Sequence, residues 1–260
     1  MEELYPRLTI LLLIVVRVSA FFVIMPLFSH RTIPAMHRIG FALLISWMMY
    51  YTIDVEPLEI NGEYIMLIIK EALVGLFIGL IAYIVLSAIQ IAGNFIDFQM
   101  GFAIANVIDP QTGAQSPLMG QYLYTLSLLM LLYFDGHHLI MDGIFFSYQF
   151  VPMDQLAIAF GEPIAAEFVI KAFAATFVIA FQIASPVVAT LFLVDIALGI
   201  VARTSPQFNI FVIGLPIKIT VAFIILSVLM GVTFKVIQGL FDLMFVVMRD
   251  IMTILGGGIV

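Results

Sequence analysis

The sequence predicts an all-helical integral membrane protein, and three observations support this prediction. Of the 260 residues, 63% are hydrophobic and only 10% are charged, whereas about 25% of the residues in a soluble domain carry charge. The hydrophobic excess extends along the whole chain, with a mean hydropathy of +1.19, so no soluble domain of useful size fits between the apolar runs. Helices are expected because irregular backbone in lipid would leave N–H and C=O groups unpaired.

A membrane-spanning helix needs about 20 mostly apolar residues, and apolar runs of that length, together with some shorter ones, define the expected helices. They are residues 8–27, 39–53, 64–99, 118–134, 139–150, 167–201, 208–234 and 236–254. The run 64–99 is either one long helix or two helices broken near Gly93. Ser185-Pro186 is placed to kink the run 167–201. We expect residues 135–138 to turn a hairpin, and the last two runs to form a helix pair.

Charged and amide side chains interrupt these apolar runs. Arg17 lies midway through residues 8–27, and a charge near the bilayer centre costs about 2.5–3.5 kcal/mol on insertion scales. Such helices should therefore face protein or a watery conduit, and we expect neighbouring subunits and a central passage to balance these groups. Lys70 and Glu71 are expected near a membrane interface, with their charged ends reaching water. The remaining interruptions are Gln90, Asn94, Asp97, Gln99, Gln182, Asp195, Arg203, Lys218 and Lys235.

One segment is rich in residues that break helices. It comprises Asn106, Val107, Ile108, Asp109, Pro110, Gln111, Thr112, Gly113, Ala114, Gln115, Ser116 and Pro117. The residues before it are Phe98, Gln99, Met100, Gly101 and Phe102. The segment carries a single charge, which is unusual for a solvated loop. Two interpretations are open, an ordinary connection or a loop packed inside protein that plugs a conduit, and the residues alone favour the first.

A second polar segment, residues 203–209, interrupts the C-terminal apolar runs. Ser205-Pro206 ends one helix, and Pro216 distorts the next, which frees backbone groups that neighbouring protein must satisfy. Residues 184–260 therefore form an expected helical hairpin, and its corner is suited to packing in an assembly of several subunits.

Several classes of function have no support in the sequence. The phosphate-binding glycine loop, HExxH and GxSxG patterns are missing, so neither an enzyme nor a cofactor is expected. Absence of cysteine excludes thiolate metal sites. Adjacent helical side chains such as His137 and His138 diverge, so no metal site is expected there. A net charge of −7 argues against nucleic acid as a partner.

Four motifs in this order resemble the FliR family of flagellar type III export-gate proteins, and more distantly the SctT/SpaR-type proteins of virulence injectisomes. The motifs are Arg17-Val18-Ser19-Ala20 followed by Pro26-Leu27-Phe28, residues 98–103 leading to Asp109-Pro110, Phe134-Asp135-Gly136-His137-His138, and residues 203–216. The resemblance covers essentially the full length. It is most specific in the last motif, Arg203-Thr204-Ser205-Pro206-Gln207-Phe208-Asn209 and its continuation.

The resemblance implies a subunit of a closed helical complex with several copies each of FliP and FliQ, in the bacterial inner membrane at the flagellar basal body. Residues 1–183 would be FliP-like, and residues 184–260 would be a FliQ-like hairpin. Unfolded flagellar export substrates would pass through the centre, FlhB would wrap the cytoplasmic face, and FlhA would lie around or below. Other contacts would be with membrane lipid, and none with nucleic acid.

Roles for individual residues follow from the same resemblance. Residues 106–117 would lie in the lumen and help to plug the closed channel, and residues 98–102 would support them. Contacts with partner subunits would be made by Arg17, Gln182, Asp195, Arg203, Pro206, Asn209 and Pro216.

A secondary transporter is the alternative hypothesis. Asp195, Arg203 or Lys218 would then couple the movement of an ion to that of a solute. Transporters often contain paired repeats with helices broken at the bilayer midplane, and no such pairing is evident in this sequence.

Overall fold

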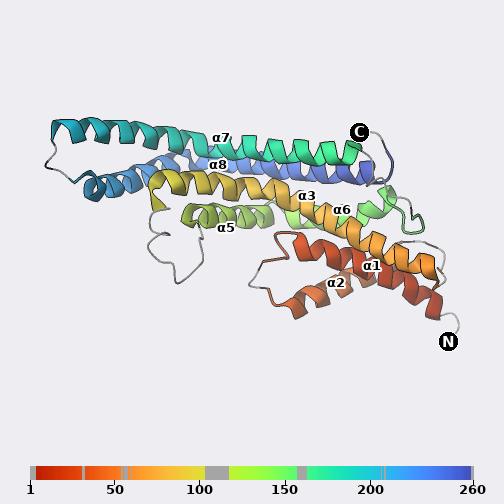
Figure 1. Cartoon of the computed structure of the whole chain (residues 1–260). Coiled ribbons are helices and arrows are strands. Elements are labelled where there is room, and N and C mark those ends of the chain that lie inside the picture. Colours follow the sequence, from red (N-terminus) through yellow and green to blue (C-terminus); the bar gives the residue numbers. More distant parts are fainter. Residues whose placement is uncertain are drawn as a thin grey trace. The chain divides into compact units, whose positions relative to one another are not determined.

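The computed structural model describes the chain except residues 1–3, 31–32, 54, 56–57, 59, 103–116, 157–162, 206, 208 and 259–260, and except the side chains of residues 4–7 and 211. Its regular elements are all helices (Figure 1). They are α1 (Leu4–Ile24), α2 (Ala35–Tyr50), α3 (Gly62–Met100), α5 (Leu118–Tyr133), α6 (Gly136–Phe150), α7 (Pro163–Thr204) and α8 (Ile210–Leu255). The predicted all-helical class is confirmed.

Three of the helices are long and apolar enough to cross a membrane. They are α3 with 39 residues, α7 with 42 and α8, in which residues Val212–Leu255 qualify. The pair α5 and α6 qualifies as a fourth candidate when it is counted as one span. Length and composition therefore support the predicted membrane class.

Two long helices are less interrupted than some of the sequence patterns suggested. α3 is one continuous helix through Gly93, which settles the open alternative for residues 64–99. α8 is also continuous, so the predicted helix pair at residues 208–254 is wrong. Lys235 lies on an exposed face of α8, where its charge needs no break in the helix.

α7 continues through Pro186, which has no N–H to bond the carbonyl of Gln182. The Ser185 hydroxyl donates to that carbonyl at 3.4 Å and replaces part of the lost interaction. Nearby serine and threonine side chains thus help the helix to tolerate proline.

The joint between α5 and α6 is shorter than expected. Only Phe134 and Asp135 separate the helices, so both histidines lie in the first turn of α6 rather than in a loop. The two helices belong to different compact units of the chain, so the expected hairpin between them stays a prediction.

Unit 1 comprises residues Met1–Leu86, Phe134–Phe173 and Asp242–Val260. α1 packs against α2, and the rings of Phe22, Phe28 and Phe41 cluster with centroids 4.3–5.6 Å apart. α1 also crosses α3 closely, because a Cβ on Gly75 would lie 2.2 Å from the Arg17 carbonyl oxygen. Unit 1 therefore has a core built around α1.

Unit 2 comprises residues Ser87–Tyr133 and Ala174–Phe241. Within it the later part of α7 and the earlier part of α8 lie side by side (Figure 1). Asp195 contacts Lys218, and a Cβ on Gly214 would contact Leu198, a register in which the two helices run antiparallel. The two helices therefore form a hairpin within unit 2, and the predicted extent of the hairpin to residue 260 stays a prediction.

Candidate functional site: a buried charge network and an anchored loop

The side chain of Arg17, in α1, is completely buried in unit 1. Its Nε and Nη2 donate to the two carboxylate oxygens of Glu71, in α3, at 2.5 and 2.9 Å. Nη1 donates to the Ser147 hydroxyl at 3.0 Å, and Nη2 also donates to the Val151 carbonyl at 2.8 Å. The Tyr148 ring lies 3.8 Å from the guanidinium carbon, as in a cation–π contact. Arg17 therefore joins α1 to α3 and α6.

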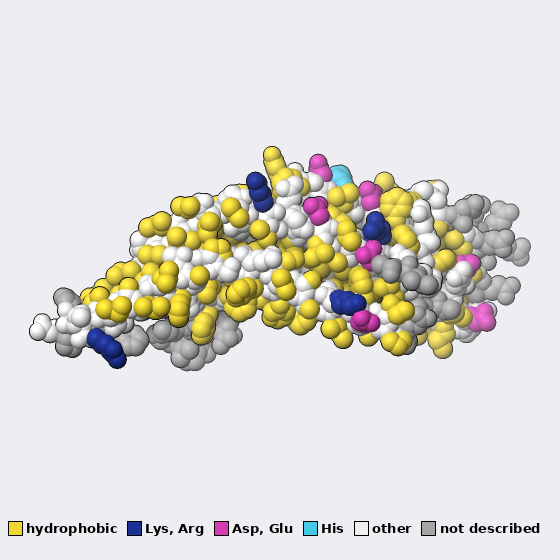
Figure 2. Space-filling model, turned by 90° about the horizontal axis from the view of Figure 1, so that it is seen from above, with side chains coloured by type: hydrophobic (Ala, Val, Ile, Leu, Met, Phe, Trp, Pro, Cys, Tyr) yellow, Lys and Arg dark blue, Asp and Glu magenta, His cyan; other side chains and the backbone are white. Residues whose placement is uncertain are grey.

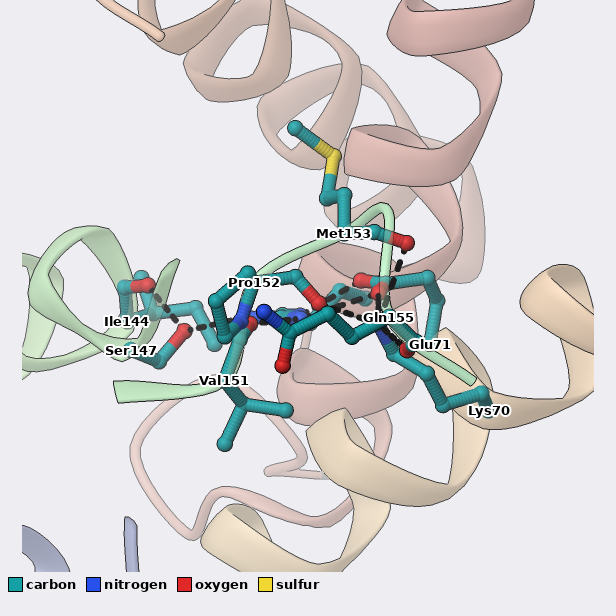
Figure 3. A network of polar contacts seen from close by, with 9 residues as sticks. Lys70, Glu71, Ile144, Ser147, Val151, Pro152, Met153 and Gln155 are labelled. Atoms are coloured by element: carbon teal, nitrogen blue, oxygen red, sulfur yellow. Dashed lines mark hydrogen bonds and ion pairs between the residues drawn. The ribbon is translucent and has the colours of Figure 1, made fainter. Parts of the chain in front are cut away.

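Lys70 brings a second buried cation to the same carboxylate. Its Nζ lies 2.9 Å from Glu71 Oε1 and donates to the carbonyls of Met153 at 3.1 Å and Gln155 at 3.0 Å (Figure 3). It also donates to the Pro152 carbonyl. These carbonyls follow the C-terminus of α6, the end of a helix that favours positive charge.

The network explains how three charged side chains can be buried in this largely apolar protein. Two cations share one carboxylate, and four backbone carbonyls supply the remaining negative partial charge. Arg17, Lys70 and Glu71 thus find their ion-pair partners within the chain, so neighbouring subunits are not needed to balance these three charges. Lys70 and Glu71 do not reach toward water either, because their side chains are 3% and 0% exposed. Any contact with a partner subunit has to be made by residues other than Arg17.

The close crossing of α1 and α3 positions this network. Gly75 and Gly79 both face α1, where Cβ atoms would lie 2.2 and 3.0 Å from the carbonyls of Arg17 and Phe21. Two glycines four residues apart are a known signal for closely packed membrane helices. This signal was available in the sequence, and it would have placed Glu71, one turn before Gly75, on a face of close helix contact.

In unit 2, the carboxylate of Asp97 lies at the N-terminus of α5. Both of its oxygens accept the Met119 N–H at 3.0 Å, and one accepts the Gly120 N–H at 3.2 Å. A carboxylate here satisfies donors that the helix itself leaves free and complements the helix dipole. The backbones of the two helices also touch, since a Cβ on Gly93 would lie 2.2 Å from the Gly120 Cα. Asp97 and the two glycines thus hold the end of α3 against the start of α5, the two helices between which residues 103–116 lie in the sequence.

The C-terminal end of α3 is fixed to the α7–α8 hairpin of unit 2 by a second polar group. Gln99 Nε2 donates to Asp195 Oδ2 at 2.9 Å, and Lys218 Nζ lies 2.5 Å from Asp195 Oδ1. Lys218 Nζ also donates to the Gln99 carbonyl at 3.3 Å. Gly101 ends α3 with a φ of 88°, a left-handed conformation that favours glycine.

The structure separates the predicted site residues into three groups. Of residues 106–117, only Pro117 lies within the described residues, so the proposed plug is otherwise outside them. Of residues 98–102, Phe98 is exposed and Met100 is buried, with the others between. Exposed positions on the described surface include Gln182, Arg203, Asn209 and Pro216, whereas Pro206 lies outside the described residues.

One side-chain cluster differs from the sequence expectation. His137 and His138 do not diverge, because their ring centroids are 4.1 Å apart. Together with Asp135 they offer three ligand atoms, all within 4.8 Å of one another. The expectation that adjacent side chains of a helix point apart fails here, because these residues lie at the start of α6, after Asp135 in the left-handed conformation.

Long apolar helices joined by buried charges define the protein as a helical integral membrane protein whose polar groups fasten helices together. Residues 8–244 match the family of bacterial export proteins designated family 1, and the chain belongs to this family. This assignment agrees with the expectation that the protein is not an enzyme.

The relatives confirm the predicted resemblance to FliR proteins. The chain is 56% identical to the flagellar biosynthetic protein FliR of Bacillus subtilis (strain 168), over 98% of this chain and 97% of the relative. It is 30% identical to FliR of Pectobacterium carotovorum subsp. carotovorum, over 92% and 90%. It is also 30% identical to the Yop proteins translocation protein T of Yersinia pestis, over 86% of each chain.

Proposed function

We propose that this protein is a core subunit of the flagellar type III protein export gate in the bacterial inner membrane, at the flagellar basal body. With FliP and FliQ it would form the channel through which unfolded flagellar subunits leave the cytoplasm. The observation that carries the proposal is the near full-length similarity to a flagellar biosynthetic protein FliR, at 56% identity. Flagellar use is favoured over injectisome use by this 56% match, since the identity to a Yop translocation protein, 30%, equals that to a second FliR.

Exposed apolar surface supports a role within an assembly. In the most apolar window of α3, 56% of the residues are buried within the chain, against 28% in α7 and 17% in α8. Figure 2 shows hydrophobic side chains spread over much of one face, with few charged side chains among them. We propose FliP, FliQ and FlhB as neighbours, with FlhA around or below. Gln182, Arg203, Asn209 and Pro216 are among the exposed positions available to them.

The FliP-like and FliQ-like division at residue 184 remains part of this proposal. The antiparallel register of the hairpin, with Asp195 against Lys218, lies entirely within the proposed FliQ-like part. The last residues of α8 belong to unit 1, so the proposed division does not coincide with the compact units.

The proposed mechanism is passive gating by residues 106–117. Asp97 and the Gly93–Gly120 contact give this segment a fixed base, while the Gln99–Asp195–Lys218 group holds the end of α3. A fixed base lets a segment yield to a translocating chain without displacing the helices that carry it. The energy for export would come from elsewhere, since the sequence has no nucleotide-binding motif.

Deletion of residues 113–116 tests the plug. In the assembled complex we expect the deletion to raise the conductance of the membrane to small ions, because the shortened segment no longer fills the passage. A four-residue deletion at 157–160, in a different connection, serves as the length-matched control and should keep the membrane sealed. Unchanged conductance in the 113–116 deletion, with normal assembly, would count against the plug. Export itself is tested by loss of secretion and motility in cells that lack the protein.

A further inference from the structure

Four consecutive residues, Asp135-Gly136-His137-His138, place three metal-ligating side chains together at the start of α6. One ligand atom from each of Asp135, His137 and His138 lies within 4.8 Å of the other two. The backbone explains this convergence. Asp135 has a φ of 56° and a ψ of 20°, and its carbonyl accepts the His138 N–H at 2.9 Å. This turn brings Asp135 back over the histidines.

We propose that Asp135, His137 and His138 form a binding site for a divalent transition-metal ion. Two imidazoles and one carboxylate suit Zn²⁺, Co²⁺ or Ni²⁺, whereas Ca²⁺ and Mg²⁺ prefer oxygen ligands throughout. Three protein ligands leave at least one coordination position open to water or to another group.

The spacing of the three ligand atoms is close to what such an ion needs. Nitrogen and oxygen ligands lie about 2.0–2.2 Å from Zn²⁺, which separates them by about 3.4 Å in a tetrahedral site. The observed atoms are at most 4.8 Å apart, and two of the three side chains, Asp135 and His138, are exposed. Rotation of exposed side chains closes a gap of this size without moving the helix.

An independent observation concerns His137. Its Nδ1 atom is buried and has no hydrogen-bond partner among the described residues. A buried polar atom without a partner destabilises the fold, and coordination of an ion through this nitrogen would supply the missing partner. The positive end of the α6 dipole opposes a cation only weakly, because the dipole acts as a partial charge at the surface.

A bound ion would fasten the residue that starts α6 to the first turn of that helix. The other end of α6 carries Ser147 and Val151, which both bond Arg17. The ion would therefore stiffen a helix that holds the buried network of unit 1, a role separate from the proposed gating segment.

The test uses the intact export complex purified through a tag without histidine, stripped of metal and titrated with Co²⁺ and with Zn²⁺. We expect about one ion per chain, a visible Co²⁺ absorption band, and a higher melting temperature with Zn²⁺. Asp135→Asn removes the carboxylate and keeps a residue that tolerates the left-handed backbone. His138→Gln removes the second imidazole at an exposed position, where the substitution should leave the fold intact. Each variant should weaken Co²⁺ binding at least ten-fold.

The matched control is the double variant His30→Gln, His37→Gln, which removes the other two histidines and should bind Co²⁺ like the wild type. Without metal, each variant should have the same melting temperature as the metal-free wild type, which shows that the variant is folded. The proposal is overturned if the wild-type complex binds neither ion, if His138→Gln binds Co²⁺ unchanged, or if the His30/His37 variant loses the ion.

Discussion

At the scale of single residues, the Glu71 carboxylate bonds two cations at once. Arg17 takes both oxygens, and Lys70 shares Oε1 with it. Burying charges costs free energy that only well-formed partners offset, so removing one partner is far more harmful than the pair is stabilising. Glu71 is the central member, because its loss leaves two buried cations facing only backbone carbonyls, Ser147 and the Tyr148 ring.

Replacing Glu71 with Gln should destabilise the protein strongly. Gln keeps the size of the side chain but removes the negative charge, and breaking a buried pair in this way costs about 3–5 kcal/mol. We expect a large fall in the melting temperature of the detergent-extracted complex and a lower amount of the protein in membranes. Glu167→Gln is the control, because Glu167 pairs with Lys171 on an exposed face of α7 and should change neither. Wild-type stability of Glu71→Gln would contradict the role given to the network.

The sequence predicted that Arg17 needs a partner, but not which one. Periodicity along α3 does not fix which face of that helix turns toward α1, so Lys70 and Glu71 were assigned to a membrane interface. Gly75 and Gly79 carry the missing information, since glycines four residues apart mark a face of close helix contact. Asp97 was recognised only as one of several polar residues, because a cap supplied by another helix leaves no local pattern.

At the scale of elements, apolar run length predicted where helices lie better than where they break. The continuous course of α3 through Gly93 has a packing reason, since Gly93 meets the backbone of Gly120. The polar residue Lys235 did not interrupt α8, because an exposed charge needs no change in the backbone. The joint at Phe134–Asp135 was placed correctly but made too long, because the left-handed Asp135 lets α6 begin at once.

Gly93→Ala tests the contact between α3 and α5. The added methyl group would lie 2.2 Å from a backbone atom of Gly120, so the helices have to move apart. Overpacking of this kind costs about 1–3 kcal/mol or more, and a lower melting temperature of the complex is expected. The matched control is Gly231→Ala in α8, where a Cβ meets nothing within 4 Å. This control should be neutral or slightly stabilising, because Ala favours a helix over Gly. Equal melting temperatures for the two variants would contradict the close contact.

At the scale of the whole molecule, the chain balances some of its polar groups internally and leaves apolar surface open. Unit 1 supplies the ion-pair partners of Arg17, Lys70 and Glu71 from its own residues, and unit 2 pairs Asp195 with Lys218. On α7 and α8, in contrast, large apolar side chains such as Leu193, Val212 and Val228 are 65%, 67% and 74% exposed. Lipid or other subunits have to cover this surface, because apolar patches of that extent are not left in water.

The proposed assembly predicts that other protein subunits, rather than lipid, cover the exposed face of α8. The chain contains no cysteine, so Val228→Cys introduces a single thiol at a 74% exposed position. Reagents that join cysteine to nearby protein should link this position to another export component in membranes that contain the full apparatus.

Native mass measurement of the extracted complex should give a species much heavier than the 28.9 kDa chain. Expressed without FliP and FliQ, the chain should be degraded or should aggregate, since lipid alone does not hold the exposed hairpin in one arrangement. A stable, uniform monomer under those conditions, with Val228→Cys unreactive toward protein in the full apparatus, would mean that lipid covers α8 and that the subunit role is wrong.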